Sequence, residues 1–470
     1  MASNVDVDMA AANADAVAAQ MDAMDVERVV EDDDGEMLIE DEGEDLGANY
    51  LEDDGSIEDG GDDGTFASLQ QVEEQLKAGV EQPFKRAASR DDARSTLATH
   101  GDAVYCCAFA PNGDALTGGG DDKAFLHFGA GAGAASRSVE LGGHTDSVTT
   151  CGFSHTGAFA ATGSYDGTVK LWDATTGNLA RTLDGPGDVE WLKWHPKGDV
   201  VLCGSGDGTC WMWLATSGGC MRVFAGHDGA VLCGAFTCDG KQIVTGSADG
   251  SVRVWAPKKG ICKHAFLPRP DGPPRAAGGD LAMCQGAVTA LDVHPVDPEL
   301  VVAAAEDGTA VVLHCKTKKV VNVLEHAVAK TVRRDDGEDE DPAYGVVAVA
   351  FSVTPATWVA TGSVDGFLKV WDFKAVPSRP RVSLLHNTAV VSVAWFPDEP
   401  KLISNSADLS VKVWDARSGA PLHTFLGHSD IPLAMAVSFA PQDADGVVLS
   451  AGDDQAAKLF AIPKAEKTAA

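Results

Sequence analysis

Basic residues are scarce in this chain of 470 residues. It has 36 lysines and arginines but 70 aspartates and glutamates, so its formal net charge is −34. Affinity for nucleic acid comes mainly from cations that displace counterions, and docking on anionic lipid also depends on basic residues. The sequence therefore predicts no direct nucleic-acid binding and no membrane binding. It favours a basic protein or peptide as the partner.

Targeting and membrane-spanning segments are also missing. The amino terminus, Met1–Ala10, has neither the basic region nor the apolar stretch of a secretory signal. No apolar run approaches the ~18 residues needed to cross a bilayer. We therefore expect a soluble, intracellular monomer in the cytoplasm, with the nucleus as an alternative compartment.

The sequence lacks the common motifs of metal sites and enzymes. Its eleven cysteines show no C-x-x-C pair, and most fall within apolar, strand-like runs where reduced thiols pack as small hydrophobic side chains (Cys106, Cys107, Cys151, Cys203, Cys233). The motifs G-x-x-x-x-G-K-[ST], H-E-x-x-H and G-x-S-x-G are absent. The sequence thus predicts a protein that is not an enzyme, with no catalytic residue, no metal and no cofactor.

The first 64 residues differ in composition from the rest. They hold 23 acidic residues and a single base, Arg28, so about two thirds of the net charge lies in the first seventh of the chain. Such a segment buries too little apolar area to offset its ordering entropy, which predicts a disordered acidic tail over residues 1–64. Two roles for the tail stay open, a loose arm for a basic partner and a solubilising segment.

A short helix and a linker are expected over residues 65–92. Five apolar residues recur there at helical spacing after the possible N-cap Thr65, namely Phe66, Leu69, Val72, Leu76 and Val80. We expect this helix to pack on the folded body rather than to bind a partner. Residues 465–470 are expected to form a short C-terminal tail.

The decisive feature is an internal repeat that begins near His100. Blocks close to G-S-x-D-G-x-V-[KR]-[LV]-W end at Trp172, Trp255 and Trp371, and five weaker copies bring the number to eight. The turn aspartates of the eight copies are Asp121, Asp166, Asp207, Asp249, Asp307, Asp365, Asp408 and Asp454. Alternating apolar and polar residues broken by Asp-Gly turns make each copy a small antiparallel sheet.

These blocks resemble the WD-repeat family, with literal Trp-Asp dipeptides at Trp172, Trp371 and Trp414. The resemblance implies an all-β, eight-bladed propeller over residues 93–464. It also implies that the ring is closed by a strand from Ala93–Thr99, which pairs with the last blade and removes free sheet edges.

The resemblance further implies a buried hydrogen-bonded tetrad in each blade, made of a histidine, a serine or threonine, the turn aspartate and the tryptophan. The best copies are His144, Thr162, Asp166 and Trp172; His227, Thr245, Asp249 and Trp255; and His386, Ser404, Asp408 and Trp414. A His–Ser/Thr–Asp group is also the arrangement of nucleophilic catalysis. Its recurrence at one spacing favours a scaffold, because an active site occurs once and a buried aspartate needs partners.

Two insertions lengthen the repeat. One contains the proline-rich segment Pro268–Arg275 and the other contains six acids in Asp335–Asp341. Neither shows hydrophobic periodicity, so both are predicted to be loops, the second forming an additional negative patch.

Three stretches narrow the resemblance, Gly119–Phe125, Gly187–Pro196 and Asp207–Trp213. Together with the acidic leader they are similar to the family of the angio-associated migratory cell protein and its fungal relatives. The resemblance implies, from those fungal relatives, a dedicated chaperone of a basic large-subunit ribosomal protein.

In this family, partner contacts gather on the narrow top face of the propeller. Carried over position by position, that face comprises Tyr105, Thr149, Tyr165, Asp188, Glu190, Leu232, Glu306, Val364, Val391 and Asp453. Tyrosines and acids over small apolar residues suit a basic peptide or a basic amphipathic helix. Strand alternation places Trp191 in the core instead.

Three functions follow as hypotheses. The first is a chaperone or escort that holds a basic ribosomal protein before assembly. The second is a substrate receptor of a cullin-RING ubiquitin ligase, because Leu402–Arg417 resembles the box with which such receptors dock their adaptor. The third is a cell-migration or signalling scaffold, which the family resemblance also implies.

Overall fold

The computed structural model describes residues 90–132, 135–268, 283–284, 286–326, 332–333, 339–340, 345–439 and 446–463. The chain divides into two units, Met1–Ser89 and Arg90–Ala470, and the described residues all belong to the second. The predicted acidic tail, the predicted helix and the C-terminal tail lie outside the described residues, as does Pro268–Arg275 except for Pro268. None of the described residues forms a helix long and apolar enough to cross a membrane.

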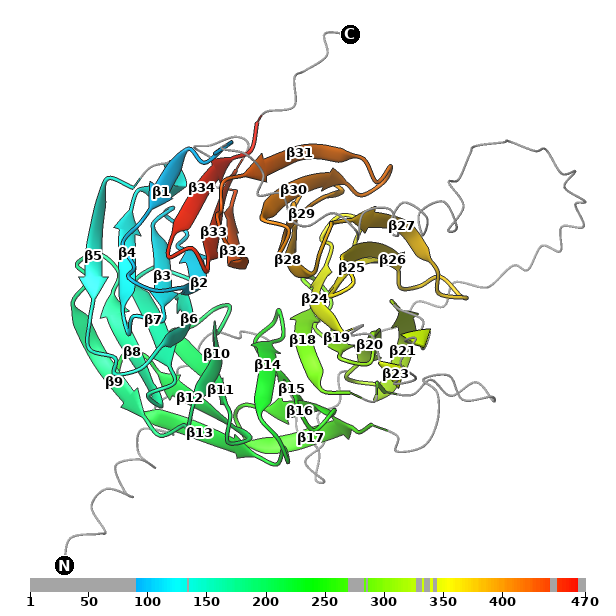
Figure 1. Ribbon diagram of the computed structural model, residues 1–470. Helices are drawn as coiled ribbons and strands as arrows, with labels where there is room; N and C mark the ends of the chain where they lie inside the picture. The colour runs from blue at the N-terminus through cyan, green and yellow to red at the C-terminus, as the bar shows by residue number, and fades with distance from the viewer. Residues whose placement is uncertain are drawn as a thin grey trace, which may run out of the picture. The chain divides into compact units, whose positions relative to one another are not determined.

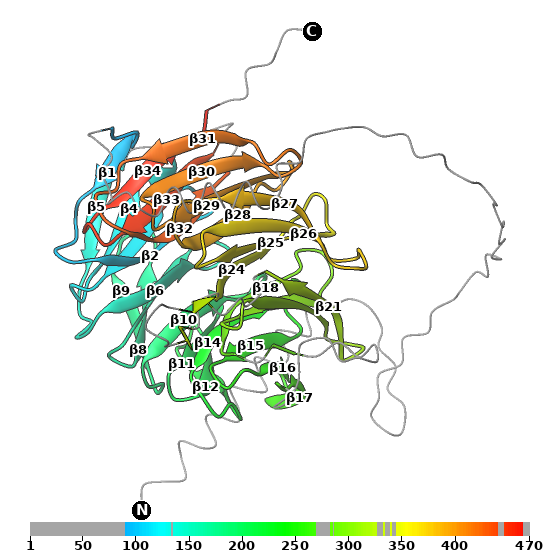
Figure 2. The same cartoon turned by 45° about the vertical axis from the view of Figure 1, so that its right-hand side comes forward.

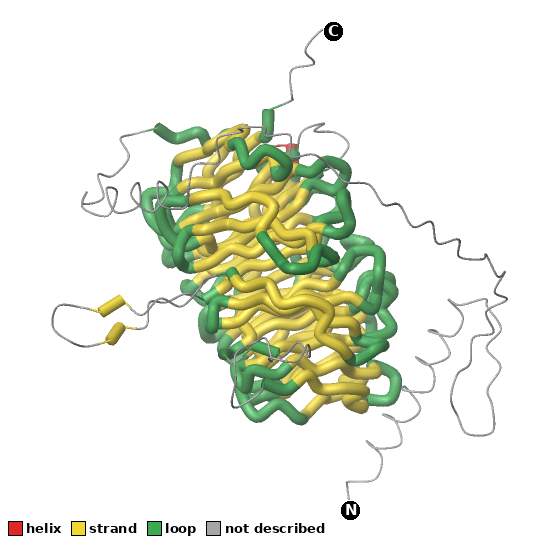
Figure 3. The backbone as a smooth tube through the Cα atoms, turned by 90° about the vertical axis from the view of Figure 1, so that its right-hand side faces the viewer, coloured by secondary structure: helices red, strands yellow, loops and turns green. Residues whose placement is uncertain are grey.

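Eight four-stranded antiparallel sheets, the blades, form a ring around a common axis (Figure 1). This confirms the prediction of an all-β, eight-bladed propeller. In each of blades 1 to 7, four consecutive strands run from the innermost to the outermost position. Seen from the side, the strands lie between two faces that are made of turns and loops (Figures 2 and 3).

The first four blades hold the strands from β2 to β17. Blade 1 contains β2 (Val104–Phe109), β3 (Ala115–Gly119), β4 (Ala124–Phe128) and β5 (Arg137–Leu141), with the 3-10 helix η1 (Ala130–Ala132) after β4. Blade 2 contains β6 (Val148–Phe153), β7 (Phe159–Ser164), β8 (Thr168–Asp173) and β9 (Leu179–Asp184). Blade 3 contains β10 (Val189–Trp194), β11 (Val200–Ser205), β12 (Thr209–Leu214) and β13 (Cys220–Ala225). Blade 4 contains β14 (Val231–Phe236), β15 (Ile243–Ser247), β16 (Val252–Ala256) and β17 (Ile261–Phe266).

The last four blades complete the ring. Blade 5 contains β18 (Val288–Val293), β19 (Leu300–Ala305), β20 (Thr309–His314) and β21 (Lys319–Glu325). Blade 6 contains β24 (Val346–Phe351), β25 (Trp358–Ser363), β26 (Phe367–Asp372) and β27 (Pro380–Leu385). Blade 7 contains β28 (Val390–Trp395), β29 (Lys401–Ser406), β30 (Ser410–Asp415) and β31 (Pro421–Leu426). Blade 8 contains β32 (Pro432–Ser438), β33 (Val447–Gly452), β34 (Ala457–Ala461) and, outermost, β1 (Ser95–Leu97).

Strand β1 closes the ring, as the sequence predicted. It pairs antiparallel with β34, with Ser95 opposite Leu459. The residues before β1 are tied to blade 7 as well, because the Asp92 amide donates to the Leu426 carbonyl at 2.8 Å and the Asp92 carboxylate accepts from the Leu426 amide at 3.0 Å. The outer strand of blade 8 thus comes from the opposite end of the propeller sequence, and β34 is not left as a free edge.

Apolar side chains fill the space between neighbouring blades. Leu171 of blade 2, for example, packs in one cluster with Leu192 and Trp213 of blade 3. Because side chains alternate across each strand, each sheet can bury apolar residues against both neighbours. Full burial of one large apolar side chain stabilises the fold by about 1.5–3 kcal/mol. Trp191 is buried in such a cluster, which confirms its predicted core position.

The Asp-Gly turns need a residue with positive φ after the turn aspartate. Glycine takes this conformation in blades 2 and 4, where φ is 77° at Gly167 and 75° at Gly250. Asp122, Leu409 and Gln455 occupy the same position in blades 1, 7 and 8 with φ between 60° and 68°. A Cβ disfavours this region, so the backbone of the turn is set by the blade as a whole and not by glycine alone.

The acidic insertion after blade 5 departs from the prediction of a plain loop. Strands β22 (Val332–Arg333) and β23 (Asp339–Glu340) pair antiparallel within it. A ladder of two residues on each side needs only backbone groups. It therefore leaves no hydrophobic periodicity in the sequence from which it could be predicted.

Candidate protein-binding face

The three predicted tetrads are hydrogen-bonded networks in the structure. In blade 2 the His144 Nδ1 lies 2.9 Å from an Asp166 carboxylate oxygen, and His144 Nε2 lies 2.8 Å from the Thr162 hydroxyl. The Trp172 indole donates to the same hydroxyl at 2.9 Å. Because the carboxylate only accepts, His144 donates through Nδ1 and accepts from Thr162 at Nε2.

Blade 4 repeats this arrangement around Thr245. The Thr245 hydroxyl lies 2.7 Å from His227 Nε2 and accepts from the Trp255 indole at 2.8 Å. His227 Nδ1 lies 3.0 Å from an Asp249 carboxylate oxygen. The Thr245 side chain is fully buried, so both of its hydrogen bonds are needed to satisfy the hydroxyl.

Blade 7 builds the same tetrad with a serine in place of the threonine. The Ser404 hydroxyl lies 2.7 Å from His386 Nε2 and accepts from the Trp414 indole at 2.8 Å. His386 Nδ1 lies 3.2 Å from an Asp408 carboxylate oxygen. Ser404 is as fully buried as Thr245, which shows that the network depends on the hydroxyl and not on the threonine methyl group.

The protonation states of the tetrads follow from burial and these bonds. Burial lowers the pKa of His144, and Asp166 opposes that shift only in part. Burial also opposes ionisation of Asp166, but hydrogen bonds from Thr168, the Thr145 amide and His144 lower its pKa to about 2. The pair is therefore a neutral imidazole that donates to a fixed carboxylate, and each polar atom of the tetrad has its partner.

The structure adds related networks that the tryptophan and 22-residue spacing did not reveal. In blade 1, His100 contacts Asp121 and Thr117, and His127 replaces the tryptophan with its Nε2 3.0 Å from Thr117 Oγ1. In blade 6, His326 Nδ1 lies 2.7 Å from Thr361 Oγ1. The acidic insertion separates His326 from its turn aspartate in the sequence, which hid it from spacing arguments. A group that recurs in so many blades is a scaffold device.

Blade 8 carries an incomplete copy. His428 Nδ1 lies 3.0 Å from Asp454, but Phe460 occupies the place of the tryptophan. His428 Nε2 and Ser450 Oγ, which would bond each other in a complete tetrad, are both buried without a partner.

The end of the ring that carries the turn aspartates is named the top face, and the opposite end is named the bottom face. Each innermost strand has a β-bulge at the second residue from its top end. The eight bulge residues are Tyr105, Thr149, Glu190, Leu232, Thr289, Val347, Val391 and Leu433. A bulge residue is left out of the ladder, which re-aims its side chain.

A second backbone feature recurs in every blade. The residue before the turn aspartate donates its amide to the carbonyl of the residue that lies two positions before the bulge, at 2.8 to 3.1 Å. The eight pairs are Gly120–Ala103, Tyr165–Ser147, Gly206–Asp188, Ala248–Ala230, Glu306–Ala287, Val364–Gly345, Ala407–Ala389 and Asp453–Ile431. Together with the bulge residues they define 24 equivalent positions, which we name the top-face ring.

All ten residues predicted for the top face lie at positions of this ring. Asp188, Glu306 and Asp453 are exposed, as are Tyr105 (41%) and Tyr165 (43%). Glu190, Leu232 and Val391 are half-buried, and Val364 is 38% exposed. Of the 24 ring positions, all within the described residues, four are acidic and none is lysine, arginine or histidine.

Thr149 differs from the other predicted residues. Its hydroxyl donates to the Val189 carbonyl at 2.6 Å, and Thr289 makes the corresponding bond to the Val346 carbonyl in blade 6. These two bulge threonines join neighbouring blades. Their hydroxyls are therefore already engaged within the ring.

The acids of blade 3 create a negative potential beside the tyrosines. Burial raises the pKa of Tyr165, and the charges of Glu190 and Asp188 raise it further. Burial also raises the pKa of Glu190, with a further contribution from Asp188. A cation that approached Glu190 would relieve this repulsion, so the local electrostatics favour a basic ligand.

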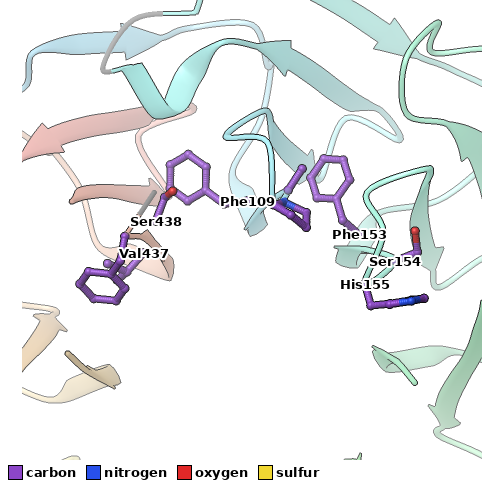
Figure 4. A pocket seen from close by; sticks show the side chains of 9 residues that line it. Phe109, Phe153, Ser154, His155, Val437 and Ser438 are labelled. Carbon is purple, nitrogen blue, oxygen red and sulfur yellow. The ribbon is translucent and has the colours of Figure 1, made fainter. Parts of the chain in front are cut away.

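The bottom face has a different chemistry. A hollow of about 420 Å³ opens at the lower ends of β2, β6 and β32, lined by Phe109, Ala110, Pro111, Phe153, Ser154, His155, Val437, Ser438 and Phe439 (Figure 4). Its lining contains no carboxylate. The top-face ring, which carries the four acids, lies at the opposite ends of the same inner strands.

Within the described ranges, nine of the cysteine thiols are buried or half-buried and two, Cys220 and Cys262, are exposed. Burial raises the pKa of Cys233 to about 12, so this thiol stays neutral. All eleven cysteines are free. Across those ranges, no group of three His, Cys, Asp or Glu side chains is placed to hold a metal ion.

Comparison with known proteins identifies the family. The WD domain, G-beta repeat profile matches residues 92–126, 136–173, 177–213 and 218–256, and the Nucleolar protein 10-like N-terminal domain profile matches residues 279–467. The angio-associated migratory cell protein of Homo sapiens is 31% identical over 381 residues, which cover 80% of this chain and 82% of the human protein. The chain belongs to the angio-associated migratory cell protein family.

Solved structures share the fold of this family member. The crystal structure of Saccharomyces cerevisiae Sqt1 matches with a TM-score of 0.69 and 19% identity, over 80% of this chain and 100% of that chain. Chaetomium thermophilum Sqt1 matches with a TM-score of 0.63 and 20% identity, over 79% and 98%. WD40 propellers are typically non-catalytic scaffolds, which agrees with tetrads that recur as part of the fold.

In this family member, the structure adds three bulge residues to those that the sequence predicted for the top face. Thr289, Val347 and Leu433 are bulge residues that the sequence analysis did not include. The number of residues between a bulge residue and the turn aspartate of its blade could have located them in principle. Insertions and weak repeat copies in blades 5, 6 and 8 obscured that distance.

Proposed function

We propose that this protein is a non-enzymatic chaperone or escort that captures a basic segment of its partner on the top-face ring. The sequence resemblance favours a basic large-subunit ribosomal protein as that partner, held in the cytoplasm or nucleus before assembly. The WD40 fold and family membership support a protein-binding scaffold.

The composition of the top-face ring carries the proposal. Four acids and two exposed tyrosines occupy it, and its 24 described positions include no basic residue. Exposed acids steer a cationic partner toward the face and raise its association rate. The rings of Tyr105 and Tyr165 add rigid contact area, which slows dissociation.

The acidic segment 1–64 serves in this proposal as a second, loosely tethered arm. It holds 23 acids and one base. A tethered second site raises the effective concentration of a bound ligand near the first site. Its removal should therefore reduce capture only in part.

Binding of a basic large-subunit ribosomal protein tests the proposal. Equilibrium binding is measured for the wild type, Glu190→Lys/Glu306→Lys and each single reversal, at low and high ionic strength. We expect the double reversal to weaken binding clearly and each single reversal to cost ~1 kcal/mol or less. The affinity of the wild type should fall with salt, because the Debye length shrinks from ~10 Å at 0.1 M to ~3 Å at 1 M.

Arg417→Ala is the matched control. Arg417 is exposed in the turn between β30 and β31 on the bottom face. The ubiquitin-ligase hypothesis predicts that this change abolishes binding of a ligase adaptor and that top-face reversals leave adaptor binding intact. If the double reversal does not change binding of the ribosomal protein, the proposal is wrong.

A further inference from the structure

The bottom face carries a concentration of charge that is opposite in sign to the net charge of the chain. It lies in the turns between the third and fourth strands of blades 4, 5 and 6, where the outermost strands β17, β21 and β27 begin (Figure 1). Residues 256–263, 314–321 and 373–383 hold nine lysines and arginines, three in each segment, all of them exposed, and no acid. We name these three segments the basic rim. The corresponding turns of blades 1, 2, 3 and 7 hold a single base, Arg417.

The three segments of the basic rim are neighbours in space. Burial lowers the pKa of His264 in β17, and the charge of Lys318 from blade 5 lowers it further, so Lys318 lies close to blade 4. The Asn322 side chain in β21 donates to the Phe373 and Ala375 carbonyls of blade 6 at 2.9 and 3.2 Å. The basic rim is therefore continuous across the three blades.

Acids of the same face leave the charge of the basic rim uncompensated. Asp372, directly before the blade 6 segment, is half-buried and accepts from the Lys374 amide at 3.2 Å. Within the described part of the chain, Lys316, Lys318 and Lys319 form no ion pair with a carboxylate. The bottom loops of blades 4 and 5 contain three acids that are half-buried, Asp239, Asp297 and Glu299. Neighbouring bases without a paired acid create a local positive potential.

Branched aliphatic side chains lie among these bases. Val376 is 87% exposed in the blade 6 turn, between Lys374 and Arg379 in the sequence, and Ile261 is 53% exposed in the blade 4 segment. The segments contain one Phe, Tyr or Trp side chain, Phe373, and it is buried. The basic rim thus offers no such aromatic side chain for stacking a nucleobase. It offers apolar contacts next to positive charge, which suits a protein ligand.

We propose that the basic rim binds an acidic segment of a partner protein, in which carboxylates alternate with aliphatic residues. The carboxylates pair with the lysines of the three turns, and the aliphatic residues cover Val376 and Ile261. The net charge of −34 does not prevent this binding, because exposed charges beyond the Debye length of ~8 Å at physiological salt are largely screened. The basic rim lies at the opposite end of the ring from the top-face ring, so the inference goes beyond the proposed function and does not rest on it.

Two synthetic peptides of about 16 residues, about 50 Å long when extended, provide the test. One alternates glutamate with leucine and isoleucine, and the other has serine in place of each aliphatic residue. Fluorescence anisotropy gives Kd for each peptide with the full-length protein. We expect the binding of both peptides to weaken as salt rises, and the aliphatic peptide to bind about fivefold more tightly. Ile261→Ser/Val376→Ser should remove this difference.

Charge reversal at the centre of the basic rim tests its location. Lys316→Glu/Lys318→Glu should weaken binding of both peptides by about tenfold or more. Lys197→Glu/Arg417→Glu is the matched control, because it reverses two exposed charges of the same face in blades 3 and 7. The control should change Kd by less than about twofold. Unchanged melting temperatures verify that each variant is folded.

Other outcomes would overturn the proposal. An equal loss of affinity in the two charge-reversal variants would mean a general charge effect, and equal affinities for the two peptides would exclude the aliphatic contacts. Single-stranded RNA or phosphatidylcholine–phosphatidylserine vesicles that bound more tightly than the aliphatic peptide, and lost affinity in Lys316→Glu/Lys318→Glu, would assign the basic rim to nucleic acid or membrane. Peptide binding that required deletion of residues 1–64 would assign it to the acidic segment of the chain itself. Absence of saturable binding of either peptide to both proteins would leave the basic rim without this role.

Discussion

His127 Nε2 lies 3.0 Å from the Thr117 hydroxyl, in the position from which tryptophan donates to Thr162 in blade 2. The Nδ1–H group of His100 donates a hydrogen bond to the Asp121 carboxylate, so His100 Nε2 must accept one from the Thr117 hydroxyl. The Thr117 oxygen in turn accepts a hydrogen bond from His127 Nε2. The Ser138 hydroxyl then donates to His127 Nδ1 at 2.8 Å. These directions hold for a neutral His127, and burial keeps it neutral by lowering its pKa to about 4.

Acid should therefore destabilise blade 1 through His127. Burial lowers its pKa from 6.5 to about 4, so the unfolded chain takes up this proton first as the pH falls. The contribution of neutral His127 to the free energy of unfolding is complete above pH 6.5. It is lost between pH 6.5 and 4, which lowers the free energy of unfolding by roughly 3 kcal/mol. Denaturant unfolding of the wild type and His127→Trp should show a stability difference that moves in favour of the variant over this range. A constant difference would contradict the assignment.

Loss of a tetrad aspartate should destabilise the fold without removing a specific activity. Asp249→Ala leaves His227 Nδ1 and the amides of Asp228 and Ser251 without their acceptor. We expect a loss of ~1–3 kcal/mol in the free energy of unfolding. Asp228→Ala, which changes an exposed side chain, should have little effect. A fully stable Asp249→Ala protein would show that the network is dispensable.

Removal of the closing strand should lower the melting temperature. A protein that starts at Arg90 keeps β1, whereas one that starts at His100 leaves the β34 edge unpaired. Each kcal/mol lost lowers Tm by about 2–4 °C in a domain of 150–250 residues, so we expect a drop of several degrees. Asp91→Ala serves as the control, because it keeps β1 and removes only the partly exposed ion pair with Lys458 and one hydrogen bond from the Ala93 amide. Equal melting temperatures for the two truncations would mean that β1 does not stabilise the ring.

Charged and aromatic residues of the top face should affect different rate constants. Glu190→Lys reduces steering, so it should mainly slow association with a basic ribosomal protein. Tyr165→Ala removes an exposed aromatic contact and should speed dissociation, by roughly tenfold if Tyr165 is a hot spot. Surface plasmon resonance at several salt concentrations separates the two constants. If Tyr165→Ala slowed association and left the dissociation rate constant unchanged, Tyr165 would not be an anchor.

Much of this architecture could be predicted from the sequence because the repeat constrains it. A spacing of 22 residues between His144 and Asp166 reflects one inner strand, one turn and the next strand, so it recurs wherever those lengths are kept. His326 was missed because an insertion lies between it and Asp365. The weaker repeat copy that ends at His127 was recognised, but it was not counted as a tetrad because a histidine stands in the place of the tryptophan. The bulges themselves have no residue-type signature, because any residue type can occupy such an irregularity of backbone pairing; only the distance from the turn aspartate could locate them.

The bulge in every inner strand has a consequence for how binding specificity can change. Side chains at Tyr105, Glu190 and Val391 lie outside the register of the ladder. Their replacement does not shift the pairing of any strand, in contrast to substitutions in the blade cores. Six of the eight bulge positions, all except the two threonines that join blades, can therefore be substituted in any combination while the backbone stays unchanged. A library randomised at these six positions should yield folded propellers that select new ligands.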